Sequence, residues 1–221
     1  MKVFAPRIIV FSIMAATFLS PLYAHHGAQF LSGAMEMNTA TVRFAEIAPK
    51  KTENASIREF AKMLARDHNQ ILDRIKQLRD ARLADSISAN GRITGDAAKI
   101  ATAGVHMTPA HQRIFERLAT LSGDAFDRDF MDVMVQEHRQ AIRDFEAHSH
   151  AHGNAITGGK KQGAPSDQTA RQKPVAPDHK TYSREELRLD VDTAEFAAAT
   201  LPILRRHLEQ AEEILKDLPS K

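Results

Sequence analysis

Two stretches of the sequence, FAKMLARDH and FMDVMVQEH, end in an acidic residue followed by histidine and begin with phenylalanine eight positions earlier. They place Asp67 before His68 and Glu137 before His138. In each stretch the apolar residues recur every three or four positions, which is the period of a helix that packs on other helices. Both histidines fall on that apolar face. The repeat therefore predicts two buried imidazoles that face one interior.

Three such histidines suggest a metal site. His207, in the helical stretch TLPILRRHLEQA, is the third candidate. Three imidazoles can hold copper or zinc, and Met134, one turn before His138, can add a thioether for Cu(I). The alternative is that each is a core histidine with one hydrogen-bond partner, such as Asp67 or Glu137 on a neighbouring helix. The sequence leaves both interpretations open.

Two further histidine groups are secondary metal candidates. In AHSHAHG, His148 and His152 are four positions apart and share a helix face, whereas His150 points elsewhere. The alternative is a solvated last helical turn, where cationic side chains suit the helix dipole. His25 and His26 follow a predicted cleavage point, and a free amine beside an imidazole can bind Cu(II). The alternative for this pair is a flexible terminus.

Several kinds of chemistry are excluded by missing residues. The chain has no cysteine, so thiolate metal sites and cysteine nucleophiles are excluded. A di-iron bundle site needs Glu-x-x-His on two helices, and that motif occurs nowhere in the sequence. Asp67 and Glu137 directly precede their histidines and so point about 100° away around a helix. Phosphate-binding loops and serine-nucleophile motifs are also absent. We therefore predict no enzymatic activity.

Residues 1–24 have the pattern of a secretory signal peptide. A basic start is followed by a short apolar run and by small residues that predict cleavage after Ala24. No further run is long and apolar enough to span a bilayer. We expect a periplasmic protein without an integral membrane segment, with envelope association as a candidate. The formal charge is +2 for the full chain and falls to about zero when Lys2 and Arg7 are removed with the signal peptide, which argues against nucleic-acid binding. The partner is unknown.

Helical periodicity dominates the rest of the chain, and strand patterns are nearly absent. A capping box begins the last helix at Ser183, and Pro202 should kink that helix. Loops are predicted at 85–107, and residues 153–182 lack large apolar side chains and are expected to be disordered. The sequence predicts one all-α domain, a four-helix bundle with a shorter extra helix. Residues 25–152 supply the first four helices and 183–221 complete the bundle. The expected helices are 28–48, 54–84, one from Pro109 to about Leu121, 124–152 and one from Ser183.

The chain resembles a bacterial family of exported, ferritin-like helical proteins, catalogued as the domain of unknown function number four-one-four-two. The resemblance covers about 30–152 and 183–218. The segment DRDFMDVMVQEHRQAI also resembles the Met-His helix of a related exported family, some of whose members bind copper. This chain has Thr41 where a glutamate is common in the family, and its 153–182 segment is longer than usual. The matching positions are Phe60, Met63, Asp67, His68, Phe126, Asp127, Met134, His138, Leu201, Pro202 and His207.

The resemblance implies a ferritin-like fold and export, and it brings no established activity. Two functions follow from the sequence. The first is a non-catalytic structural or envelope-stress protein, in which acid–histidine pairs tie helices together. The second is a periplasmic protein that binds copper or zinc through His68, His138, His207 and Met134.

Overall fold

In the computed structural model, residues 27–93, 101, 106–156 and 184–219 are described, and no strand occurs among them. Four long helices form the bundle, and a short fifth helix, α4, packs beside α1. A single turn of 3-10 helix, η2, follows α1. The elements are α1 (Gly27–Ile47), η2 (Ala48–Lys50), α2 (Ala55–Asn90), α4 (Pro109–Thr120), α5 (Gly123–Ile156) and α6 (Arg184–Asp217). The all-α prediction is confirmed.

Local capping explains where these helices start and stop. The Asn54 side chain accepts hydrogen bonds from the backbone amides of Ser56 and Ile57 at the start of α2. Thr108 caps α4 in the same way, with Pro109 in the first turn, as the sequence predicts. α2 ends where Gly91 adopts a left-handed conformation with φ of 66°.

Two predicted helix ends are wrong. Residues 85–90, expected to be a loop, continue α2, because nothing between Ala84 and Gly91 breaks a helix. Gly153 does not end α5, which continues to Ile156; a glycine inside a helix lowers its stability without stopping it. The predicted loop therefore lies partly in α2, and most of the predicted disordered segment and the Ser183 cap lie outside the described residues.

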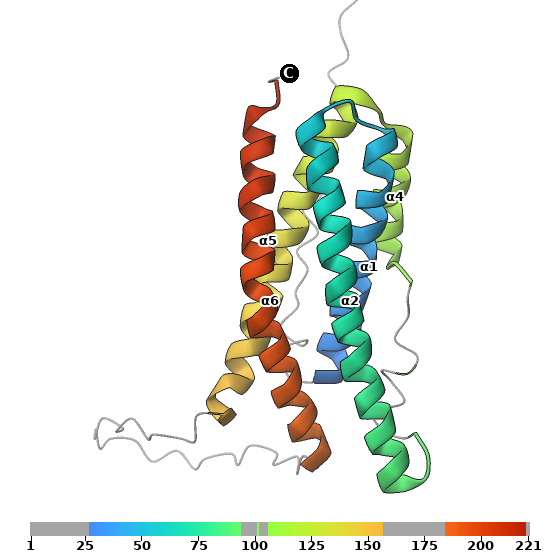
Figure 1. Ribbon diagram of the computed structural model, residues 1–221, viewed down its shortest axis with the longest axis vertical. Helices are drawn as coiled ribbons and strands as arrows, with labels where there is room; N and C mark the ends of the chain where they lie inside the picture. Colours follow the sequence, from blue (N-terminus) through green and yellow to red (C-terminus); the bar gives the residue numbers. More distant parts are fainter. Residues whose placement is uncertain (1–26, 94–100, 102–105, 157–183, 220–221) are drawn as a thin grey trace, which may run out of the picture.

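The long helices are connected as two antiparallel pairs. Figure 1 shows α1 rising and α2 descending on one side, and α5 descending and α6 rising on the other. α1 packs mainly on α2, and α5 mainly on α6. Because α4 carries the chain back to the end where α2 begins, α2 and α5 run in the same direction. The two repeated stretches therefore enter the bundle from the same end, and each reaches its histidine after about four turns.

A layer of polar side chains divides the hydrophobic core. One apolar cluster contains Phe30 and Phe145, and the other contains Phe44 and Phe130. Each long helix contributes one buried polar residue to this layer, and the three that are histidines each have neighbours one turn away in both clusters. We call this set the polar layer: Asn38 of α1, His68 of α2, His138 of α5 and His207 of α6. The predicted helix faces are confirmed, and they meet at this layer.

Two further features concern the bundle as a whole. Pro202 lies inside α6, and Figure 1 shows that helix changing direction partway along its length. A proline inside a helix removes one amide and clashes with the carbonyl four residues earlier, which accounts for a bend there. Among the described helices, none has a stretch both long and apolar enough to cross a bilayer.

Candidate metal centre

The three histidines of the polar layer lie against one another at the centre of the bundle. Their ring centroids are separated by 5.4 Å (His68–His138), 5.2 Å (His68–His207) and 5.4 Å (His138–His207). One ring nitrogen from each lies within 4.8 Å of the other two. The exposed fractions of the three residues are 0 %, 1 % and 0 %. The three rings are therefore arranged as a near-equilateral triangle that is closed to solvent.

Asn38 fixes the orientation and tautomer of His68. The Asn38 amide nitrogen donates to the Ala34 carbonyl at 2.6 Å, so its Oδ1 faces His68 Nδ1, at 2.7 Å. An amide oxygen only accepts, so His68 Nδ1 carries the proton. The His68 Nε2 atom is then an unprotonated nitrogen that points to the centre of the triangle.

His138 is held in the same tautomer by its own helix. Its Nδ1 lies 2.8 Å from the Met134 carbonyl oxygen, one turn earlier on α5. Since a carbonyl cannot donate, Nδ1 again carries the proton and Nε2 bears the lone pair. The Nε2 atoms of His68 and His138 are 3.3 Å apart. Two nitrogens that bind one tetrahedral ion at about 2.0–2.1 Å are separated by roughly the same distance.

His207 is oriented by an acid on the neighbouring helix. Its Nε2 donates to Asp67 Oδ2 at 3.0 Å, while Nδ1 is buried and has no hydrogen-bond partner. Asp67 also accepts from Arg206 at 3.1 Å and from Arg66 at 2.9 Å. Burial alone would raise the pKa of Asp67, but the hydrogen bonds from His207 and Arg66 and the positive charge of Arg66 lower it below its ordinary value. Asp67 is therefore an anionic acceptor that leaves His207 Nδ1 free for the centre.

The surroundings keep all three imidazoles neutral. Burial, and then the neighbouring imidazoles, lower the pKa of His68 well below its ordinary value. Burial and the proximity of His207 lower the pKa of His138 to about 4. The pKa of His207 is also lowered by burial, although its bond to Asp67 opposes the shift. Three unprotonated nitrogens thus converge without a hydrogen-bond donor among them, and a cation bound between them would satisfy all three.

The other candidate residues have different surroundings. Met134 is fully buried in the core and supplies its backbone carbonyl to His138. His148 does not lie on a solvated turn: it is buried, bonds through Nε2 to the Thr193 hydroxyl and stacks on Phe30. His150 is exposed, so it does not share a face with His148. The His152 side chain, together with His25 and His26, lies outside the described residues.

Three partners of the predicted residues were not predicted from the sequence: Asn38, Arg206 and His111. Asn38 is a polar residue one turn after Ala34 on the buried face of α1, and that spacing could have revealed it. Arg206 precedes His207 and reaches back to Asp67. His111 of α4 pairs with Glu137 at 3.2 Å, so the second acid of the repeat contacts α4, outside the centre.

Comparison with protein families places most of the chain in one of them. The family described as "Domain of unknown function (DUF4142)" matches residues 15–156. That range includes α1 to α5, with Asn38, His68 and His138, and it ends before α6 and His207. Searches among curated proteins and among solved structures found no match.

Proposed function

Since the chain belongs to the DUF4142 family, whose function is unknown, we propose a function from its site: binding of one zinc or copper ion by His68, His138 and His207. The observation that carries the proposal is the convergence of three unprotonated imidazole nitrogens inside a closed core. Imidazole is a good ligand for both metals, and three of them leave one coordination position.

The partners of the three histidines support this proposal. Histidines that bind metals usually donate their other N–H to a carboxylate, a backbone carbonyl or a similar acceptor, which fixes the ring. Here the three acceptors are the Asp67 carboxylate, the Met134 carbonyl and the Asn38 amide oxygen. If these histidines served only as core packing, three lone pairs directed at one another would not be expected, because each unpaired buried nitrogen lowers the stability of the fold.

The donor set separates the proposed metals from iron. No carboxylate belongs to the histidine group among the described residues, and Asp67 is engaged by one histidine and two arginines. Zinc and copper accept an all-nitrogen donor set, whereas di-iron bundle sites use carboxylates. Met134 remains the candidate thioether if the metal is Cu(I). We infer a binding role without catalysis, in the periplasm after removal of residues 1–24, in a bundle of ferritin-like arrangement.

A structural role is the second candidate. It is favoured by two acid–histidine contacts that each join two helices: Asp67 with His207, and Glu137 with His111. On this alternative the repeated acid and histidine serve packing, and the polar layer fixes the register of the four helices. Buried polar groups are known to specify register at some cost in stability.

Elemental analysis of untagged protein distinguishes the two candidates. The control is a variant with His150→Ala and His152→Ala, which removes adventitious chelation and keeps the core residue His148. We expect one zinc or copper ion per chain in both proteins and none in a His68→Gln variant. If metal is absent from the parent, or is present in the parent and lost from the control, the structural candidate replaces the metal proposal.

A further inference from the structure

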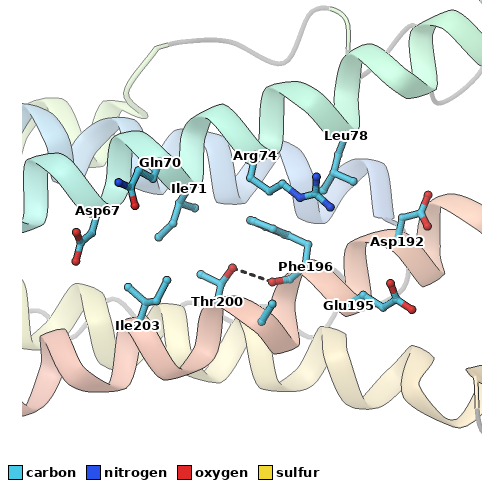
Figure 2. Close-up of a pocket in the computed structure, with 11 residues that line it drawn as sticks. Asp67, Gln70, Ile71, Arg74, Leu78, Asp192, Glu195, Phe196, Thr200 and Ile203 are labelled. Carbon is cyan, nitrogen blue, oxygen red and sulfur yellow. Dashed lines mark hydrogen bonds between the residues drawn. The ribbon is translucent and has the colours of Figure 1, made fainter.

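A groove between α2 and α6 ends at Asp67, the residue that bonds His207. Its volume is about 550 Å³, and Asp67 lines its inner end. Figure 2 shows Asp67 at one end, Ile71 and Thr200 along the middle, and Asp192 and Glu195 at the other end. The groove thus connects the carboxylate that holds His207 to an exposed acidic opening on α6.

The packing of the bundle explains why the groove lies between these two helices. α2 and α6 contact each other less extensively than the antiparallel pairs do. The residues of α6 that line the groove lie between Asp192 and Ile203, about three turns of helix, and Pro202 is at one end of this segment. A proline bends a helix in the turn before it, so this segment of α6 is positioned differently from an uninterrupted helix.

The other sides of the centre are closed. Two apolar clusters cover it above and below, and the Ala34 and Met134 carbonyls lie behind Asn38 and His138. The three histidines and Asn38 are at most 1 % exposed, whereas Asp67 is 7 % exposed. Among the residues that hold the centre, Asp67 is thus the one that borders the groove.

We propose that this groove is the route by which the metal ion reaches and leaves the three histidines, passing Asp67 at its inner end. The inference rests on the proposed function. The two carboxylates at the opening, Asp192 and Glu195, outnumber the one cation that lines the groove, Arg74. The Asp67 carboxylate is already paired with Arg66 and Arg206. Acidic side chains along a narrow path raise the local concentration of a cation and its association rate.

The test is to obstruct the groove without touching the centre. Ala199 lines the groove and is exposed, and its neighbour Ala198 is exposed and does not line it. Ala199→Trp fills the groove, and Ala198→Trp is the matched control. Loading is followed by mixing metal-free protein with Zn²⁺, and release by adding a chromogenic chelator. Asp67→Asn is unsuitable as the main test, because it would also weaken the hold on His207.

We expect Ala199→Trp to slow both loading and release roughly tenfold or more while the dissociation constant stays within about twofold, as a blocked route requires. Ala198→Trp should behave like the parent protein. Equal rates in Ala199→Trp and the parent, with one Zn²⁺ bound in each, would overturn the route and leave the metal site standing. Failure of the parent to bind Zn²⁺ or copper would overturn both proposals.

The acidic residues at the opening of the groove allow a second test of the route. Replacing Asp192 by Asn and Glu195 by Gln should slow Zn²⁺ loading at low ionic strength, and the difference should disappear in high salt because exposed charges are screened. Glu213→Gln, at an exposed position of α6 outside the groove, is the control. An equal effect of this control would show general charge attraction and would contradict a role for the opening.

Discussion

His138 and His148 lie about three turns apart on α5, and both are buried, yet their surroundings differ in chemistry. His138 Nδ1 donates a hydrogen bond to a backbone carbonyl, and its unprotonated Nε2 faces two other imidazoles. At His148 the Thr193 hydroxyl donates to the Leu189 carbonyl, so it accepts the proton of His148 Nε2. Phe30 covers the ring at 4.0 Å between centroids. Burial alone therefore does not make a histidine a candidate ligand; its hydrogen-bond partners and the direction of its unprotonated nitrogen do.

Removing one histidine of the polar layer should have the largest effect. His68→Ala leaves two imidazoles, so we expect metal content to fall from one ion per chain to background. The loss in affinity should exceed the roughly 10- to 100-fold that follows removal of an outer partner. Elemental analysis and calorimetric titration with Zn²⁺ measure it, and circular dichroism checks the helices. If a folded His68→Ala variant still bound one metal ion per chain, His68 would be no more a ligand than His148, and the comparison would fail.

His148→Ala should give the opposite result. It removes the stack on Phe30 and the bond to Thr193, so the free energy of unfolding should fall by about 2–4 kcal/mol, as for other core truncations. Metal content should stay at one ion per chain. Urea unfolding of the metal-free protein measures the loss. The exposed neighbour gives the control: His150→Ala should change stability by less than about 0.5 kcal/mol. Loss of metal from folded His148→Ala would contradict the comparison.

Removing the hydrogen-bond partner of a ligand should lower metal affinity less than removing the ligand itself. Asn38→Ala frees the His68 ring to rotate, and we expect metal affinity to fall roughly 10- to 100-fold. Asn69→Ala is a matched control, because Asn69 makes the same kind of bond, to a carbonyl four residues earlier, on an exposed face. Competition with a zinc chelator measures both variants. Equal affinities in the two would show that Asn38 does not orient the centre.

Acidification should destabilise the metal-free protein. In the folded state the pKa of His138 is lowered to about 4, and the unfolded chain has a pKa near 6.5. Between these values the unfolded chain binds more protons, so stability falls as the pH drops from 6.5 toward 4. At one unit below 6.5, each histidine kept neutral by the fold costs about 1.4 kcal/mol. Urea unfolding at pH 7.5 and 5.5 tests this, and His138→Gln should weaken the dependence. Higher stability of the metal-free protein at pH 5.5 would contradict the assignment.

The helical faces could be predicted from the sequence because a single helix determines its own period. The buried positions of α2 and α5 follow the predicted pattern, and His68 and His138 lie on them as expected. The contact of His207 with Asp67 fits the prediction that an acid of the repeat bonds a histidine on another helix.

The convergence of three nitrogens could not be predicted in the same way. It depends on how far each helix slides along its neighbours, and residues 157–183, between α5 and α6, are too numerous to fix that register. His148 was predicted as a secondary metal candidate, with a solvated turn as the alternative, because its partner Thr193 is distant in sequence and gave no signal. Asn38 was missed because asparagine on a mainly apolar helix gives no metal signal by itself.

X-ray absorption spectroscopy of the metal-loaded protein tests the central claim most directly, since it reports the atoms around the ion. The control variant with His150→Ala and His152→Ala should be measured beside the parent. We predict three imidazole nitrogens at about 2.0 Å from zinc or copper in both samples. A first shell made mainly of oxygen, or a spectrum that His68→Ala leaves unchanged, would contradict a metal centre in the polar layer.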